Sequence, residues 1–227
     1  MITENKYTSL EEKVYTQLED EILSGKLTRG AALTEISLSE RLGASRTPIR
    51  GALHRLAEDG LVDIAVNRGA VVVGITEEDL VDIYRIRVRL EGLASAIAAE
   101  RMSEETCREL RESVELAEFY INKKDTERLK QLDSEFHETI YRATGNRLLC
   151  KTLSELHRKI KSYRKLSLSV PGRLERSVGE HREILRAIEA RDSAEADRLT
   201  SLHIEEALAN MMLAFEERRN QNLKEKI

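Results

Sequence analysis

The long second part of the chain, residues 76–227, contains almost none of the residues that interrupt helices. It holds four of the 11 glycines and one of the two prolines. Its apolar residues recur at intervals of three and four, which indicates successive amphipathic helices. Aromatic residues make up only 4% of the chain and 34% of its residues are charged, a composition that favours helices over sheets. We therefore expect a mainly α fold that ends in an all-α antiparallel bundle.

Short breaks divide this second part into six expected helices. Each break contains polar residues, glycine or proline, and each helix carries one apolar stripe that can face a common core. Six helices joined by short loops favour an antiparallel six-helix bundle. The expected helices span residues 77–101, 103–122, 125–144, 147–168, 173–190 and 194–218.

The first 75 residues hold the other seven glycines and divide into short elements. Capping and helix-breaking residues separate three helices, and two short apolar runs flank a tight turn. The order helix, helix, turn, helix and hairpin predicts an N-terminal winged helix-turn-helix over residues 1–75. The expected helices and strands span residues 9–23, 37–42, 46–59, 61–65 and 70–74.

Basic charge gathers on the third of these helices. Residues 41–57 contain four arginines and no acidic residue, and Arg46 and Arg50 lie four residues apart near the helix start. That end of a recognition helix enters the major groove, where an arginine can bind guanine. The hydroxyls of Ser45 and Thr47 are suited to phosphate oxygens. The pattern predicts DNA binding, with a solvated arginine face that binds another protein as the alternative.

At the expected hairpin tip, Gly69 permits close approach to DNA, and Arg68 lies beside it. The segment SRTPIRGALHRLAEDGLV and the hairpin that follows resemble the DNA-binding domain of GntR-family bacterial transcription regulators. The resemblance implies that the two arginines at the helix start read bases and that the two neighbouring hydroxyls assist at the DNA backbone. It also implies that Gly69 is the contact at the tip of the wing.

Polar residues interrupt the apolar stripes of three helices in the second part. Asp133 and His137 stand four residues apart among apolar residues, and His181 and His203 occupy similar faces further on. A buried aspartate without a partner is costly, and a divalent cation held by one carboxylate and three imidazoles would neutralise it. Ordinary core histidines with an Asp133–His137 hydrogen bond are the alternative. His157, which has basic neighbours, is interpreted as a surface residue.

Three further segments, EFHETIYRATGN, GEHREILRAIEARD and SLHIEEAL, resemble the C-terminal effector domain of the FadR subfamily of GntR regulators. The metal-containing branch of that subfamily uses one aspartate and three histidines in this order. The resemblance therefore implies the ligands Asp133, His137, His181 and His203. The expected number of helices is similar to that of the VanR-like branch. Zinc, nickel, manganese and iron all accept such ligands, so the identity of the divalent metal stays open.

Family members of this kind commonly bind a small carboxylate beside the metal, and Arg87 is the strongest candidate to receive it here. A guanidinium suits bidentate capture of a carboxylate. An ion pair between Arg87 and Glu91, four residues later, is equally compatible with the spacing. Arg164 and Arg173 are weaker candidates for the same role.

Together these patterns predict a metabolite-responsive, sequence-specific transcription regulator that acts as a repressor and as a homodimer on double-stranded operator DNA. We expect residues 1–75 to bind DNA, and residues 76–227 to bind metal and effector and to dimerise. One alternative is a metal-dependent enzyme that uses the Asp/His site, although the sequence offers no nucleophile or general base beside it. The other alternative is a metal-free helical dimerisation module.

Charge balance and apolar runs limit the partners and the location. The net charge is −4, and the first 75 residues hold 9 basic and 11 acidic residues, so DNA binding must depend on the local arginine cluster. No apolar run approaches the roughly 18 residues of a membrane span, and the first residues lack the features of a secretory signal. The chain has two cysteines, and with these features it is expected in the cytoplasm.

Overall fold

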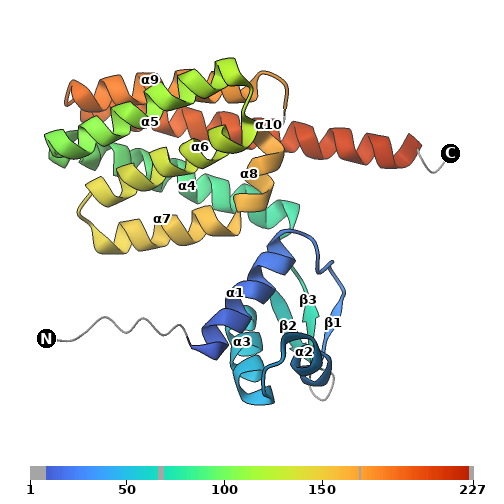
Figure 1. Ribbon diagram of the computed structural model, residues 1–227. Helices are drawn as coiled ribbons and strands as arrows, with labels where there is room; N and C mark the ends of the chain where they lie inside the picture. Colours follow the sequence, from blue (N-terminus) through green and yellow to red (C-terminus); the bar gives the residue numbers. More distant parts are fainter. Residues whose placement is uncertain (1–8, 66–68, 169, 225–227) are drawn as a thin grey trace, which may run out of the picture. The chain divides into compact units, whose positions relative to one another are not determined.

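The computed structural model describes residues 9–65, 69–168 and 170–224. The chain divides into two compact units, Met1–Asp79 and Leu80–Ile227. Helices account for most of the described residues, and the strands among them form one small sheet, as expected for a mainly α fold. Figure 1 labels the helices and strands of each unit.

The first unit is a winged helix-turn-helix, which confirms the N-terminal fold predicted from the sequence. Three helices accompany a three-stranded antiparallel sheet with the strand order β1-β3-β2, so the last strand lies in the middle (Figure 1). One apolar core joins the helices to the sheet. The elements are α1 (Leu10–Leu23), β1 (Ala32–Leu33), α2 (Glu35–Leu42), α3 (Arg46–Glu58), β2 (Val62–Ala65) and β3 (Gly69–Val72).

Side-chain caps determine where the first two helices begin. The Ser9 hydroxyl accepts a hydrogen bond from the backbone N–H of Glu12 at 3.0 Å, and α1 begins at the next residue, as predicted. Thr34 caps α2 in the same way, by accepting from the N–H of Ser37 at 3.2 Å. The helix expected from Ser37 therefore begins two residues earlier, at Glu35.

A short strand that the sequence did not reveal, β1, completes the sheet. Its two residues are too few to show an alternating pattern, but Leu33 is buried and pairs with Ala70 of β3. Gly69, expected in the turn, begins β3 with φ +80°, and a Cβ atom on it would lie 2.4 Å from the Leu33 carbonyl oxygen. Close contact with β1 thus requires glycine at this position. Arg68 lies outside the described residues.

The second unit is a helical bundle built around one large apolar core. Buried residues of α4, α5, α6, α7, α9 and α10 meet in this core, which includes Phe136 and Ile140 of α6. The apolar stripes predicted from the sequence supply these residues. The helices are α4 (Glu77–Arg101), α5 (Glu104–Lys123), α6 (Thr126–Ala143), α7 (Arg147–Lys159), α8 (Lys161–Leu168), α9 (Arg173–Glu189) and α10 (Ser193–Lys224).

The helix expected over residues 147–168 is two helices, so the described bundle has seven helices where six were predicted. Ile160 has φ −96° and ψ 2°, which depart from helical values, and α7 ends there. Figure 1 shows α8 running in a different direction from α7. The break brings α8 to α10, where the Ser167 hydroxyl donates to the Ala207 carbonyl at 3.1 Å. Neither glycine nor proline accompanies Ile160, so the sequence pattern did not indicate the break.

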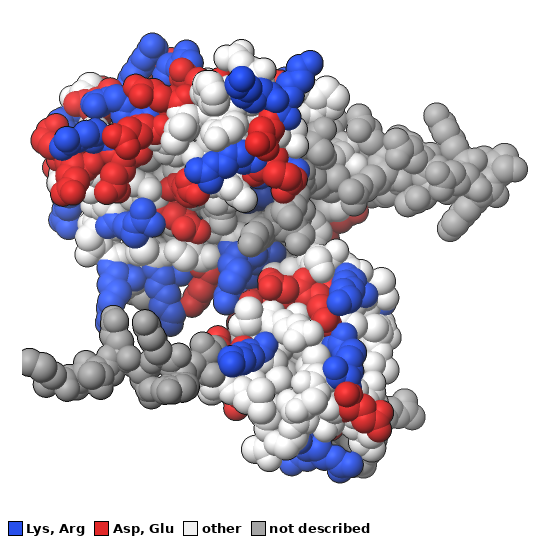
Figure 2. All heavy atoms as spheres, in the orientation of Figure 1, with Lys and Arg blue, Asp and Glu red and all other residues white. Residues whose placement is uncertain are grey.

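The surface of the helical unit carries charges of both signs. Figure 2 shows basic and acidic side chains interspersed over the face in view. Some of them form exposed ion pairs, such as Arg111 with Glu189 at 2.6 Å and Arg198 with Glu195 at 2.6 Å. Within the described ranges, no helix combines the length and the apolar character needed to cross a membrane.

We expect Gly69→Ala to destabilise the first unit more than Gly43→Ala does. Both glycines have positive φ, +80° and +63°, so alanine at either position costs about 1–2 kcal/mol. Only at Gly69 does the added Cβ also meet a backbone oxygen, because no described atom lies within 4 Å of the corresponding position at Gly43. Urea unfolding of the full chain, with hydrogen exchange in β2 and β3, measures the difference. Equal losses would contradict the close contact with β1.

Candidate functional site

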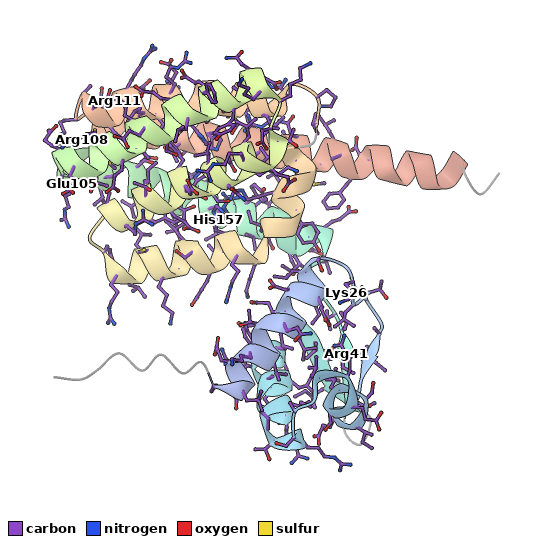
Figure 3. The ribbon with its side chains drawn as sticks, viewed as in Figure 1. Lys26, Arg41, Glu105, Arg108, Arg111 and His157 are labelled. Atoms are coloured by element: carbon purple, nitrogen blue, oxygen red, sulfur yellow. The ribbon has the colours of Figure 1, made fainter. Side chains whose placement is uncertain are left out.

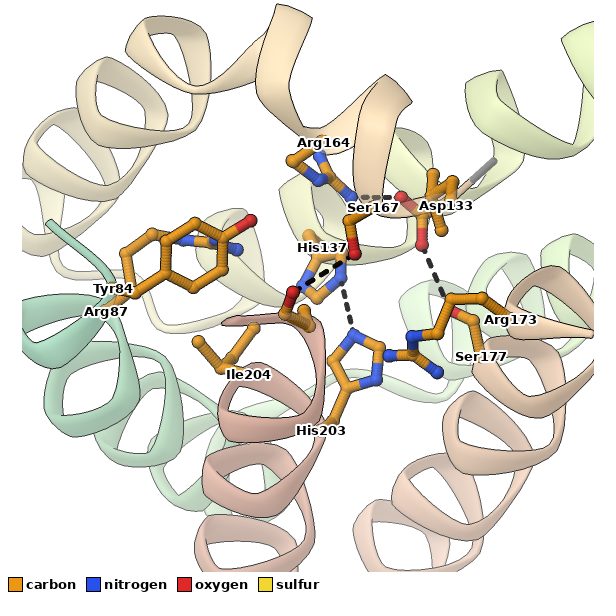
Figure 4. Close-up of a pocket in the computed structure, with 12 residues that line it drawn as sticks. Tyr84, Arg87, Asp133, His137, Arg164, Ser167, Arg173, Ser177, His203 and Ile204 are labelled. Carbon is orange, nitrogen blue, oxygen red and sulfur yellow. Dashed lines mark hydrogen bonds and ion pairs between the residues drawn. The ribbon is translucent and has the colours of Figure 1, made fainter. Parts of the chain in front are cut away.

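The four predicted metal ligands converge inside the helical unit. Asp133 and His137 project from α6 and His203 from α10 (Figure 4), and His181 comes from α9. All four side chains are buried, and one ligand atom from each lies within 4.8 Å of the other three. The spacing of four residues on α6 and the apolar stripes of the other two helices bring these side chains together.

The imidazole rings present their Nε2 atoms to one another. His203 Nε2 lies 3.3 Å from His137 Nε2 and 3.3 Å from His181 Nε2. His181 Nε2 also lies 3.6 Å from Asp133 Oδ1. A zinc ion with tetrahedral bonds of about 2.0–2.1 Å holds two imidazole nitrogens about 3.3 Å apart. The observed spacing therefore suits a single divalent ion.

Two acidic residues determine which nitrogen of each ring faces the centre. Glu91 Oε2 lies 2.9 Å from His137 Nδ1. In the same way, Glu180 Oε2 lies 2.6 Å from His203 Nδ1. Because a carboxylate only accepts hydrogen bonds, His203 donates from Nδ1 to Glu180 and leaves its Nε2 without a proton. The carboxylate beside His137 Nδ1 favours a proton on that nitrogen as well, so the Nε2 lone pairs of the two rings are available to a metal ion.

Burial favours the neutral forms of His181 and His203 by lowering their pKa values, and neighbouring positive charges keep the aspartate ionised. Desolvation lowers the pKa of His181 and of His203 well below the ordinary value. Burial alone would raise the pKa of Asp133, but the positive charge of Arg164, together with smaller contributions from neighbouring groups, holds the pKa below its ordinary value. The Asp133 carboxylate contacts Arg164 and accepts a hydrogen bond from the Ser177 hydroxyl at 3.3 Å. Neutral imidazoles with one carboxylate are a donor set that several divalent metals accept.

Arg87 forms the alternative ion pair and also lines a cavity beside the histidines (Figure 4). Arg87 and Glu91 are each 1% exposed, and the guanidinium lies 2.6 Å from Glu91 Oε1. Desolvation acts to lower the pKa of Arg87, but the charge of Glu91, together with smaller contributions from neighbouring groups, raises it above the ordinary value. The Nη1 atom of Arg87 has no hydrogen-bond partner among the described residues. The pair with Glu91 therefore leaves one donor of Arg87 unused.

The cavity has a volume of about 20 Å³, enough for about one water molecule. Arg87, Arg164 and Arg173 all line it, so the two weaker effector candidates lie at the same place as the stronger one (Figure 4). A larger cleft of about 380 Å³ shares Asp133, Arg164 and Leu168 with the cavity wall. Arg164 and Leu168 of α8 thus stand between the cavity and the cleft. Each of these three guanidiniums contacts a carboxylate, so an anion in the cavity would meet hydrogen-bond donors whose charges are already paired.

His157 is buried, which corrects its interpretation as a surface residue. It contacts Arg164 and lies 3.5 Å from the Ser134 hydroxyl, and Figure 3 shows it within the helical unit. Burial lowers the pKa of His157 well below its ordinary value. Leu149, Leu153 and His157 follow one another at intervals of four, and both leucines are buried. This spacing is the sequence signal for a buried histidine, and the basic neighbours obscured it.

Glu91 and Glu180 are parts of the site that the sequence did not reveal. Burial would raise the pKa of Glu91, but the charge of Arg87, together with smaller contributions from neighbouring groups, holds the pKa well below the ordinary value. Burial raises the pKa of Glu180, and Arg173 donates to both of its oxygens at 2.9 and 2.8 Å. A glutamate four residues after an arginine is common on exposed helix faces, so the spacing between Arg87 and Glu91 gave no sign that Glu91 is buried.

The start of α3 presents the predicted DNA-contacting residues to solvent. Ser45, Arg46, Thr47 and Arg50 are all exposed, and the Ser45 hydroxyl makes no capping hydrogen bond. Arg50 forms a bidentate ion pair with Glu35 of α2, with N–O distances of 2.7 and 2.9 Å. The sequence did not predict this pair, because Glu35 lies outside the arginine-rich segment.

The other two arginines of the cluster bind to α1 within the same unit. Arg41, labelled in Figure 3, lies 2.7 Å from Glu21. Arg55 lies 2.6 Å from Glu12, and its guanidinium carbon lies 4.1 Å from the centre of the Tyr15 ring. Of the four arginines, Arg41 and Arg55 therefore hold helices together, and the other two lie at the start of α3.

Sequence profiles of known families match both units. The profile described as "Bacterial regulatory proteins, gntR family" matches residues 10–72, and the FCD domain profile matches residues 82–206. The chain is 29% identical to the HTH-type transcriptional regulator YdhC of Bacillus subtilis, over 89% of this chain and 91% of that protein. It is 29% identical to the gluconate operon transcriptional repressor of Bacillus licheniformis, over 79% and 76% of the two chains. The solved structure of Escherichia coli McbR/YncC matches with a TM-score of 0.71 and 26% identity, over 93% of this chain and 100% of that one.

We expect Arg87→Met to destabilise the helical unit by about 3–5 kcal/mol, because it leaves the Glu91 carboxylate buried without a guanidinium. Adding Glu91→Gln to that variant removes the charge and recovers part of the loss. Arg85→Met is the control, since the ion pair of Arg85 with Asp82 on the same helix is exposed and contributes under about 1 kcal/mol. Urea unfolding followed by circular dichroism measures the three variants. A loss for Arg87→Met no larger than for Arg85→Met would contradict the role of the pair.

Proposed function

The chain belongs to the gntR family of bacterial regulatory proteins and carries an FCD domain, and from this we propose that it is a transcription repressor that binds a divalent metal and a small carboxylate effector. The observation that carries the DNA-binding part is the exposed start of α3, with Arg46 and Arg50 on a winged helix-turn-helix. Its relatives are regulators of transcription and not enzymes, which sets aside the metal-dependent enzyme.

In this proposal the start of α3 enters the major groove of operator DNA. Arg46 and Arg50 bind base edges, and the hydroxyls of Ser45 and Thr47 contact phosphates. Gly69, the first residue of β3, contacts the DNA backbone beside the groove. Two copies of the chain bind as a homodimer, because paired half-sites of a palindrome match a twofold-symmetric protein.

The metal would be held at the centre of the helical unit. When bound, the ion supplies positive charge and open coordination positions for an oxygen ligand. Glu180 holds the His203 ring in the orientation that this requires by accepting a hydrogen bond from its Nδ1, and Glu91 lies against Nδ1 of His137 on the side away from the site. The residues that would bind the ion are Asp133, His137, His181 and His203.

The arginine-lined cavity beside these residues supports an anionic effector. Arg87, Arg164 and Arg173 line it, and guanidiniums bind carboxylates through paired hydrogen bonds. One relative is named for a gluconate operon, and gluconate is a carboxylate. An effector that binds one arrangement of the helices better than another shifts the protein toward that arrangement, and this shift would change the affinity for DNA.

We expect Arg46→Ala to weaken binding to the operator by about 1–3 kcal/mol, because it loses a bidentate contact to a base. Arg50→Ala should weaken binding by less, because Arg50 gives up its ion pair with Glu35 when it binds a base. The operator is selected from random duplexes with the full-length protein. Fluorescence anisotropy at one fixed salt concentration then gives the affinity for the selected duplex and for a scrambled one.

Arg55→Gln is the matched control for these two variants. It removes the same charge from the same helix, but Arg55 faces α1 and pairs with Glu12. We expect it to weaken binding to both duplexes equally and to leave the sequence preference unchanged. Retention of the full preference by Arg46→Ala and Arg50→Ala would contradict the recognition role of α3.

For the metal, we expect the purified protein to bind one divalent ion per chain and His181→Ala to lose that ion. Glu180→Gln should weaken metal affinity by about 10–100-fold, because the His203 ring loses its carboxylate partner. Elemental analysis after dialysis, competition with a zinc chelator and the shift in melting temperature give content, affinity and stabilisation. His54→Ala, at an exposed histidine of the first unit, is the control. Wild-type protein with no bound ion and no stabilisation would favour the metal-free dimerisation module.

A further inference from the structure

The two oxygens of the Asp133 carboxylate face different groups. Oδ2 contacts the Arg164 guanidinium of α8. Oδ1 lies 3.6 Å from Nε2 of His181 and accepts a hydrogen bond from the Ser177 hydroxyl at 3.3 Å. Figure 4 shows the carboxylate between Arg164 and Ser177. One carboxylate therefore belongs both to the candidate metal site and to an ion pair that holds α8 against α6.

Arg164 differs from the other two arginines near the histidines in the carboxylate that it contacts. Each of the other two pairs with a glutamate that is not one of the four candidate ligands. Among the ion pairs of the described residues, Arg164 pairs only with Asp133. Its further contacts, with the His157 ring and with the Ser134 hydroxyl at 3.5 Å, involve no negative charge. The charge of Arg164 is therefore balanced by a candidate metal ligand.

A metal ion at the candidate site would place two cations beside one carboxylate. Asp133 and Arg164 are both buried, and their single charges balance each other. A divalent ion adds two positive charges next to the same carboxylate, and histidines that bind it as neutral ligands offset none of them. Like charges repel more strongly where water is excluded, so the ion and the Arg164 guanidinium oppose each other.

Arg164 lies on a short helix that can respond to this repulsion. The helix α8 has eight residues and follows the break at Ile160. A helix of this length has little stability of its own and depends on tertiary contacts. On the side of α10 it is held by the hydrogen bond from Ser167 to the Ala207 carbonyl, and on the side of α6 by the contact between Arg164 and Asp133. Weakening the second contact therefore loosens α8 from α6.

We propose that Arg164 is an internal cation that competes with the divalent metal for Asp133, so that metal binding loosens α8. In this role Arg164 is a positioning residue, which sets metal affinity through Asp133. This inference rests on the proposed metal function of the helical unit. By thermodynamic linkage, the arrangement with Arg164 docked on Asp133 lowers metal affinity by the same factor by which the metal disfavours that arrangement. Metal affinity and the attachment of α8 are therefore coupled.

Two variants of Arg164 in the full-length protein separate its charge from its packing. Arg164→Gln removes the charge, and Arg164→Lys keeps it. We expect Arg164→Gln to bind zinc about tenfold or more tightly than the wild type, because one repulsive charge leaves a buried site. Arg164→Lys should change zinc affinity much less. Competition with a zinc chelator measures each affinity. Arg142→Gln is the control, since it removes the same charge from an exposed position on α6 and should leave zinc affinity unchanged.

Hydrogen exchange of the wild-type chain tests the attachment of α8 without a substitution. Zinc should slow amide exchange in α6 and α9, because both helices carry candidate ligands. In α8 the same addition should speed exchange, because the contact between Arg164 and Asp133 weakens. Slower exchange in α8, parallel to that in α6 and α9, would overturn the competition.

The zinc affinities also distinguish failure of this inference from failure of the metal function. If Arg164→Gln binds zinc no more tightly than the wild type, the competition is overturned while the metal function stands, and Arg164 only orients Asp133. If neither the wild type nor Arg164→Gln binds zinc, the inference falls together with the metal function. Where Arg164→Gln does not fold, the exchange of α8 in the wild-type chain decides.

Discussion

The pairing of buried charges is the interaction on which the helical unit depends. Each guanidinium beside the cavity contacts a carboxylate, and only such pairing makes burial of these ions tolerable. Two of the pairs, Arg87 with Glu91 and Arg173 with Glu180, lie within one helix each, but other contacts of these side chains join different helices. Arg164 of α8 contacts Asp133 of α6, and Glu91 of α4 contacts His137 of α6. The side chains that neutralise one another are therefore the same ones that bring α4, α6 and α8 to a common centre.

Arginines on α2 and α3 of the first unit have two different roles: some join helices, and others are exposed at the start of α3. Arg41 of α2 and Arg55 of α3 both contact glutamates of α1, so they fix the two helices of the helix-turn-helix against a third. Those contacts leave the start of α3 exposed, with Arg46 on it. The unit holds 9 basic and 11 acidic residues over its first 75 positions, yet it still presents a locally basic helix end. Where the acidic residues lie matters more than their number.

The sequence predicted the site where a polar residue interrupts an apolar stripe, and it failed where burial had no such signal. Asp133 and His137 were found because leucine, phenylalanine and isoleucine surround them on one helix face. The Arg87–Glu91 pair was one of the expected alternatives, but the burial of Glu91 and its contact with His137 were missed, because a glutamate four residues after an arginine resembles half of a surface ion pair. The break at Ile160 and the strand β1 arise from tertiary contacts, which local propensity does not encode. The pattern of side chains thus predicted which helices meet, but not the polar partners that orient the rings.

The ion pair between Glu35 and Arg50 bears on how selective contacts at α3 can be. Glu35 already occupies two parallel donors of the guanidinium, the same geometry that guanine would offer. Any base that uses Arg50 must first displace this carboxylate, so the free energy it gains is a difference between two bidentate contacts. The contact between Arg50 and a base must therefore be more favourable in free energy than the ion pair between Arg50 and Glu35 that it replaces. A well-placed base meets this condition, and a poorly placed one does not.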